Sequence, residues 1–178
     1  MTHPAFREVD HRPWPLPSEP WVWRQVWHDL AFLHWHVAPD AIRHLVPKEL
    51  TLDEFDGQAW VAVTPFWMSD VALRGVPSLP GVSSFPEVNV RTYVRHGDRR
   101  GVWFFSLDAA SHLAVWVAQH LFRLPYVYAH MRVRPLGARI LYSSRRPSGP
   151  GFLANYEPVG PVRRAVPGSL EHFLTERY

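Results

Sequence analysis

The sequence predicts an α+β protein with a curved, mostly antiparallel sheet and two or three short helices. Nine Trp, ten Phe and six Tyr occur among the 178 residues, which favours strands. Eighteen prolines interrupt the chain throughout, which disfavours long helices. Several short segments also alternate apolar and polar residues, whereas few show helical spacing. At this length we expect one domain over residues 1–178.

The first half of the chain gives four local signals. Residues 1–20 are rich in proline and are expected to form an extended arm over the body. The aromatic stretch 21–37 fits a strand from Trp27 onward, although a helical stripe also fits. Proline and aspartate at the entry of 39–46 indicate a short helix. The pair Asp56-Gly57 indicates a hairpin turn between two strand-like segments.

The second half predicts a central strand, two helices and more strands. Segment 102–107 is apolar on both faces, as in a strand that is covered on both sides. We expect Asp108 to cap a helix through Phe122 and Ser169 to cap a closing helical turn. Further strands are expected at 126–134, 138–146 and 152–157.

Charge and composition exclude several classes of protein. The 19 basic residues are 18 arginines and Lys48, against 16 acidic residues, and the net charge of +3 is small for capture of a phosphate backbone. We therefore expect no nucleic-acid partner. No apolar run is long enough to span a membrane, and no signal peptide is recognisable. The chain has no cysteine, which is compatible with a cytoplasmic protein.

The most informative segment is SSFPEVNVRTYV, residues 83–94. Its alternation places Glu87, Asn89, Arg91 and Tyr93 on one side of a strand. Such a row is either a solvated face with a surface ion pair or the wall of a polar cavity. In the second case, Arg91 is a candidate anion clamp, Asn89 a candidate ligand contact and Glu87 a candidate acid or base.

Segment 126–130 carries a second alternating set. Tyr126, Tyr128 and His130 share one side of the expected strand. They are candidate ligand-binding residues if that side faces the same cavity, and packing residues of the sheet if it does not.

A histidine pair raises the question of a metal. His34 and His36 place two imidazoles on one face of a strand, but a metal site needs a third ligand, and chance pairs are common among 11 histidines. We expect no metal. No glycine-rich phosphate loop is present, so no cofactor is expected either.

Six segments together resemble the YqjF-like family of uncharacterised bacterial proteins, which is similar to the acetoacetate decarboxylase superfamily. These segments are WHDLAFLHWHV, FDGQAWVAVTPF, SSFPEVNVRTYV, GVWFFSLDA, LPYVYAHM and SLEHFLTERY. The resemblance implies a twisted antiparallel β-barrel or cone with a largely apolar central cavity. It also implies that Glu87 is the counterpart of the superfamily's cavity glutamate.

The resemblance argues against the superfamily's best-known reaction. In acetoacetate decarboxylases, a lysine after the helix forms an imine with the substrate ketone. In the corresponding segment of this sequence, residues 123–126, Tyr126 occupies the position of that lysine. The only lysine, Lys48, lies far along the chain in VPKEL. We therefore expect no Schiff-base decarboxylation.

The expected function is binding of a small organic acid or ketone-like metabolite in the cavity. Two alternatives stay open: a lyase or isomerase that uses Glu87 as acid or base, and a protein-interaction module with a packed, closed barrel. Relatives usually continue past the ERY segment, so the C-terminal end is expected to be shorter than theirs. A short barrel exposes a strand edge, which a homodimer would cover.

Overall fold

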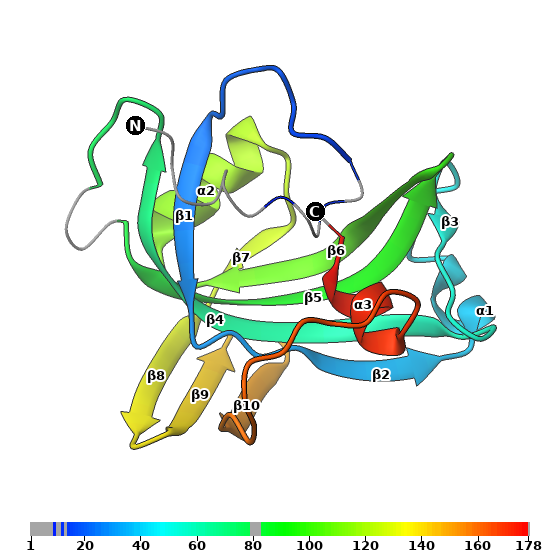
Figure 1. Cartoon of the computed structure of the whole chain (residues 1–178). Coiled ribbons are helices and arrows are strands. Elements are labelled where there is room, and N and C mark those ends of the chain that lie inside the picture. The colour runs from blue at the N-terminus through cyan, green and yellow to red at the C-terminus, as the bar shows by residue number, and fades with distance from the viewer. Residues whose placement is uncertain (1–8, 10–11, 13, 79–82, 178) are drawn as a thin grey trace.

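The computed structural model describes residues 9, 12, 14–78 and 83–177, and in this part of the chain ten strands form two sheets beside three helices (Figure 1). The first sheet has the order β1-β4-β5-β6-β7, with β2 paired to β4 and β3 to β5. Its strands are β1 (Trp23–His28), β2 (Leu33–Val37), β3 (Thr51–Leu52), β4 (Ala59–Leu73), β5 (Phe85–His96), β6 (Arg99–Ala109) and β7 (Tyr126–Tyr128). All pairs are antiparallel except β6 with β7.

The second sheet is a three-stranded antiparallel meander. It consists of β8 (His130–Leu136), β9 (Arg139–Arg145) and β10 (Gly151–Tyr156). The helices are α1 (Pro39–Arg43), α2 (His112–Leu121) and α3 (Leu170–Thr175). The predicted α+β class is therefore confirmed. The predicted barrel or cone is not, because the pairings of the described residues form two separate sheets and no closed ring.

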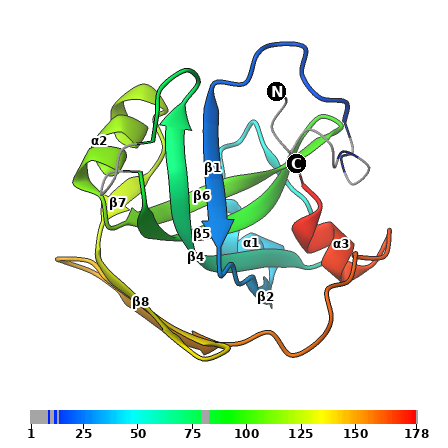
Figure 2. The ribbon, with the colours of Figure 1, turned by 60° about the vertical axis from the view of Figure 1, so that its left-hand side comes forward.

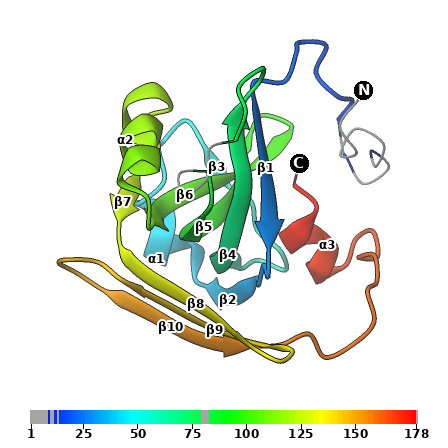
Figure 3. The same cartoon turned by 90° about the vertical axis from the view of Figure 1, so that its left-hand side faces the viewer.

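Both faces of the first sheet are covered. We call the face that carries Glu87 the inner face. Helix α2 covers one end of it, where Val115 and Phe66 share a buried cluster, and α3 covers the other end, where Phe173 packs on Tyr93. Helix α1 and the second sheet cover the outer face. Figure 2 and Figure 3 show the second sheet as a separate layer on the side opposite α2.

Hydrogen bonds from β9 attach the second sheet to the first. The Tyr142 hydroxyl lies 2.6 Å from the carbonyl oxygen of Glu87 and 3.1 Å from that of Phe66. Ser144 Oγ donates to Oδ2 of Asp108 at 3.1 Å, and the Arg146 guanidinium donates to Oδ1 at 2.6 Å. Because these contacts are buried or half-buried, they fix the position of the second sheet behind β5 and β6.

Two β-bulges change the side-chain alternation of the long strands. In β4, Asp70 and Val71 together lie opposite Gln25, and Asp70 has a φ of 53°. In β6, Phe105 is the extra residue between the partners of Val90 and Arg91. A bulge of one residue reverses which face the following side chains occupy, so residues an odd number apart come to share the inner face.

Two helix starts and one turn test the local signals. Ser169 caps α3 by accepting from the His172 N–H, as predicted. Asp56 and Gly57, with φ of 51° and 72°, form the predicted turn, closed by a bridge between the residues on either side. Ser111, and not Asp108, caps α2.

The wrong cap has a physical cause. Strand β6 continues through Ala109, so Asp108 is still part of the sheet. Its side chain lies on the outer face, where Ser144 and Arg146 bind it. The capping position therefore moves three residues along the chain to Ser111.

The N-terminal third also departs from the prediction. The strand expected from Trp27 begins earlier, at Trp23, and is interrupted at Asp29, whose φ is 51°. Residues 14–20 of the expected arm form no helix or strand, and residues 1–8, 10, 11 and 13 lie outside the described residues. The arm prediction therefore stays largely untested.

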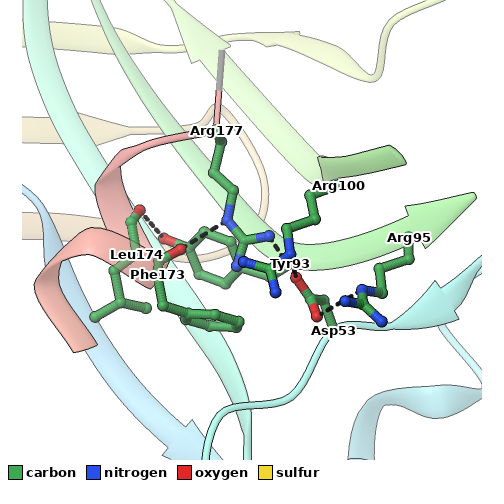
Figure 4. A network of polar contacts seen from close by, with 7 residues as sticks. All are labelled: Asp53, Tyr93, Arg95, Arg100, Phe173, Leu174 and Arg177. Atoms are coloured by element: carbon green, nitrogen blue, oxygen red, sulfur yellow. Dashed lines mark hydrogen bonds and ion pairs between the residues drawn. The ribbon is translucent and has the colours of Figure 1, made fainter. Parts of the chain in front are cut away.

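A buried ion pair fixes α3 against the inner face. The Arg177 guanidinium donates to Oδ2 of Asp53, and its centre lies 4.1 Å from the Phe173 ring. Arg95 and Arg100 approach the same carboxylate at 3.1 and 3.7 Å (Figure 4). Arg177 and Asp53 are both buried, whereas the side chains of Arg95 and Arg100 are over 40 % exposed. The short closing helix thus depends on one internal charge pair more than on its own length.

We expect Arg177→Ala to lower the free energy of unfolding by about 3–5 kcal/mol, because it leaves a buried carboxylate without its internal partner. The matched control is Arg95→Ala, which removes a partly exposed partner of the same Asp53 and should cost less than about 1 kcal/mol. Urea denaturation followed by tryptophan fluorescence measures both. Equal losses for the two variants would contradict this account of α3.

Candidate functional site: a pocket between the sheet and α2

A pocket of about 500 Å³ lies between the inner face of the first sheet and α2. Strands β1, β4, β5 and β6 form its walls on one side, and α2 with the segment up to Tyr126 forms the other. Its polar residues include Glu87, Asn89, Arg91 and Tyr126. Most of the other lining residues are apolar or aromatic, so a small polar group sits in an otherwise apolar enclosure, as is typical of small-molecule sites.

The Glu87 carboxyl is buried and hydrogen-bonded. Its exposed fraction is 3 %, and the Tyr126 hydroxyl donates to its Oε2 at 2.7 Å. Burial raises the pKa of Glu87 to about 7, although hydrogen bonds from Tyr126 and Asn89 oppose the rise. Asp108, on the outer face of the sheet, adds a smaller upward contribution. Glu87 can therefore both hold and release a proton near neutral pH.

Tyr126 is a neutral hydrogen-bond donor at this site. Burial raises its pKa, and the nearby Glu87 carboxylate raises it further. Tyr126 is the first residue of β7, which pairs in parallel with β6. Strand β6 lies between β7 and β5, and the Tyr126 side chain reaches across β6 to Glu87 on β5. The phenol therefore orients the Glu87 carboxyl without competing for its proton.

Asn89 and Arg91 continue the polar row along β5. Arg91 is 1 % exposed, and its guanidinium lies 5.0 Å from the centre of the Phe32 ring. Asn89 is also buried, and its Oδ1 has no hydrogen-bond partner among the described residues. The Cα atoms of Glu87 and Arg91 are about 13 Å apart along the strand, at about 3.3 Å per residue. The row thus offers a proton-exchanging carboxyl, an amide acceptor and a cation spread over the floor of one pocket.

The other two predicted residues lie elsewhere. Tyr128 stacks on His112 with ring centres 3.6 Å apart, and it does not line this pocket. His130 is exposed and opens β8 of the second sheet. The alternation of 126–130 did not carry over because β7 ends at Tyr128 and Ala129 separates the two sheets. Four of the six predicted site residues therefore share one pocket.

The apolar wall is the part of the site that sequence reasoning missed. Trp23 and Trp27 reach it from β1, and Phe122 reaches it from the end of α2. The two bulges add Val71 and Phe104 to the same wall. Only the aromatic excess hinted at such a wall, because no local pattern places a bulge.

His34 forms a structural hydrogen bond. Its Nε2 lies 2.6 Å from the Tyr93 hydroxyl, which itself donates to the carbonyl oxygen of Leu174. Since that hydroxyl has one proton to give, Nε2 of His34 must be the donor between the two. Burial, with Arg91 nearby, lowers the pKa of His34 to about 4, so the ring is neutral at pH 7.

The remaining candidates for metal and imine chemistry lie apart. His28 bonds Ser69, His36 packs edge-on against Trp60, and no group of three or more His, Asp or Glu in the described residues could hold a metal ion. Lys48 is exposed in the turn after α1 and does not line the pocket. No helix in the described part of the chain is long and apolar enough to cross a membrane.

A second hollow, of about 850 Å³, lies between residues 163–167 and α3. Of its ionisable residues, Arg163, Arg164 and Glu171 are exposed, and His172 and Glu176 are half-buried. Because none of the described ionisable residues that line this hollow is buried, we place the candidate site at the α2 pocket.

Comparison with solved structures shows the class of fold. The chain is similar to acetoacetate decarboxylase from Legionella pneumophila, with a TM-score of 0.57, 15 % identity, and coverage of 82 % of this chain and 54 % of that one. It is also similar to an acetoacetate decarboxylase-like enzyme from Sphingomonas wittichii RW1, with a TM-score of 0.53, 18 % identity, and coverage of 71 % and 52 %. A third similar structure is that of the enduracididine biosynthesis enzyme MppR complexed with pyruvate. Its TM-score is 0.53, with 16 % identity and coverage of 72 % of this chain and 55 % of that one. The fold is therefore acetoacetate decarboxylase-like, and the chain spans about half the length of these structures.

Sequence comparison gives the family. Residues 24–178 match the model of DUF2071, described as an uncharacterized conserved protein. Over 165 residues the chain is 42 % identical to the uncharacterized protein YqjF of Bacillus subtilis (strain 168), covering 92 % of this chain and 68 % of YqjF. The chain belongs to the DUF2071 family, and the predicted resemblance to YqjF is confirmed.

The raised pKa of Glu87 gives a testable dependence of stability on pH. Between about pH 4.5 and pH 7 the folded protein holds a proton on Glu87 that the unfolded chain releases. The free energy of unfolding should therefore fall by about 3 kcal/mol from this group as the pH rises through that range. Glu87→Gln should remove this slope.

Urea titrations from pH 4 to pH 8 measure the difference between the wild type and Glu87→Gln. Glu54→Gln, at an exposed position, is the control and should follow the wild type. Parallel curves for the wild type and Glu87→Gln would show that Glu87 titrates as an ordinary surface carboxyl.

Proposed function

We propose that this protein binds a small organic acid or ketone-like metabolite in the α2 pocket. Arg91 is the anchor for a carboxylate, because guanidinium groups pair with carboxylates in two parallel hydrogen bonds. The amide oxygen of Asn89 is an acceptor for a hydroxyl group or a water molecule of the bound ligand. Glu87 and Tyr126 contact the reactive or carbonyl-bearing part of the ligand.

One observation carries this proposal: a buried carboxyl, a buried amide and a buried arginine share one mostly apolar pocket of about 500 Å³. Buried ionisable groups cluster at functional sites, so a row of them that faces a mostly apolar cavity favours a ligand site over a structural role. The cavity also argues against the alternative of an interaction module with a packed interior.

The structural relatives add support at the level of ligand class. MppR has been solved with pyruvate and with the condensation product of pyruvate and imidazole 4-carboxaldehyde. Other relatives are acetoacetate decarboxylases. These proteins act on or bind small carbonyl compounds, and we extend that class to this pocket by analogy of fold.

A screen of pyruvate, acetoacetate and related acids should raise the melting temperature of the wild type. At a ligand concentration of 100 Kd the gain is about 2.7 kcal/mol. That corresponds to roughly 5–10 °C for a chain of this size. Arg91→Gln should abolish the shift because it removes the carboxylate anchor while keeping much of the side-chain volume. Differential scanning fluorimetry gives both values.

The control for that screen is Arg95→Gln, on the same strand but outside the pocket. It should lower the basal melting temperature at most slightly and keep the ligand shift. A shift that survives in Arg91→Gln, or a screen without any shift, would count against the proposed binding mode.

Catalysis by Glu87 as acid or base is the second candidate function, and the pKa of about 7 favours it. In this version the Glu87 carboxylate takes a proton from the carbon beside the ligand carbonyl and later returns it. No imine is involved, because the single lysine lies outside the pocket.

This version predicts exchange of that carbon-bound proton in D₂O, followed by NMR, for an acid found in the screen. Exchange should persist in protein that was incubated with the acid and borohydride and then desalted, and it should fall at least 100-fold in Glu87→Gln. Mass spectrometry should detect no reduced adduct. An adduct on Lys48, or loss of exchange after borohydride, would point to imine chemistry instead.

A further inference from the structure

We infer that the ligand of the α2 pocket is an acid with an extended apolar tail, such as a medium-chain or aromatic 2-oxo acid, and not a three- or four-carbon acid. This inference rests on the proposed binding function and names its ligand class. Its evidence is the volume of the pocket, the arrangement of polar and apolar groups with depth, and the chemistry of the mouth.

The pocket is too large for a very small acid. At about 30 Å³ per water molecule, 500 Å³ corresponds to about 17 water volumes. Pyruvate has only six non-hydrogen atoms and would leave most of that space to water. Water held against apolar walls has few hydrogen-bond partners, so a ligand that displaces it gains affinity.

Polar and apolar groups are separated by depth. Glu87, Asn89 and Arg91 are at most 3 % exposed and form the floor. The partly exposed lining side chains are mostly aromatic, with Trp27 at 38 % and Phe122 at 47 %. A ligand with its carboxylate on Arg91 would therefore extend its other end along apolar surface toward the mouth.

The mouth is built from large apolar side chains on two elements. Trp23 of β1 and Phe122 at the end of α2 meet edge to face, with ring centres 5.9 Å apart. Trp27 stacks at a tilt on the buried Phe66, with centres 4.9 Å apart. Gln25 is the polar exception, and its Oε1 accepts from the Trp23 indole at 3.3 Å. Covering half-exposed aromatic rings beside a cavity with an apolar tail removes apolar surface from water and so favours binding.

The bulges extend the same apolar surface inward. Without the extra residues, Val71 and Met68 would lie on opposite faces, as would Phe104 and Leu107. With them, all four side chains line the pocket. The walls between floor and mouth are therefore mostly apolar, which matches an apolar tail better than a second charged group.

The experiment measures the affinity of a straight-chain 2-oxo acid series from pyruvate to 2-oxooctanoate by isothermal titration calorimetry. We expect the Kd to fall about three- to fourfold with each added methylene, since burying one methylene contributes about 0.8 kcal/mol. Phenylpyruvate should bind more tightly than pyruvate by at least tenfold. Arg91→Gln should weaken every member of the series.

Variants of the mouth test where the tail lies. Trp27→Ala and Phe122→Ala should flatten the dependence of the Kd on chain length, because each removes apolar surface that the tail would cover. Trp35→Ala and Trp116→Ala are matched controls, because these tryptophans are over 50 % exposed and lie outside the pocket. They should keep the full dependence. The four variants change partly exposed side chains, so the folded state is expected to survive in each.

The outcomes separate this inference from the proposed function. Arg91-dependent binding that does not change with chain length overturns the inference and leaves the proposed function in place. Absence of binding across the whole series overturns both. Affinity that rises with length equally for alkylamines of the same tail, or that ignores Trp27→Ala and Phe122→Ala, also overturns the inference, because it reports unspecific partition onto apolar surface.

Discussion

The arrangement of the molecule follows from one constraint: β5 is paired along both edges and covered on both faces, yet it carries a row of polar side chains. Each of these groups must find a partner inside the protein or face a cavity. At one end, Tyr93 is covered by α3 and bonded by His34 and the Leu174 carbonyl. At the other end, Glu87 and Asn89 meet Tyr126 and the pocket. Helix α3 and the candidate site thus both accommodate polar side chains that β5 buries.

The electrostatics of the pocket depend on both sides of the sheet. Burial favours the protonated form of Glu87, while Tyr126 and Asn89 favour the charged form. Asp108 contributes from the outer face, where Arg146 and Ser144 hold it. The balance leaves a carboxyl near its titration point in a place where water has limited access. Acid–base groups of enzymes need this combination, and a ligand-binding protein can use it to respond to protonation.

Local signals with a short reach predicted much of the fold. The alternation of 83–94, the Asp56-Gly57 turn and the Ser169 cap each follow from the conformation of a few neighbouring residues. Local signals did not predict the two bulges, because an apolar run such as that around Phe105 has the same pattern with or without an extra residue. They also did not predict that β7 and β8 belong to different sheets, which separates His130 from Tyr126. These features are decided by pairing between distant strands, and the sequence alone does not contain that register.

Tyr142 extends the boundary of the site beyond the residues that touch its cavity. Its hydroxyl reaches the backbone carbonyl of Glu87 from behind the sheet, so the second sheet holds the peptide unit from which the carboxyl projects. A library for altering ligand preference that is restricted to the pocket lining would omit this residue. Divergence within the family can retune the pocket from its back wall, through changes in a hairpin that no ligand contacts.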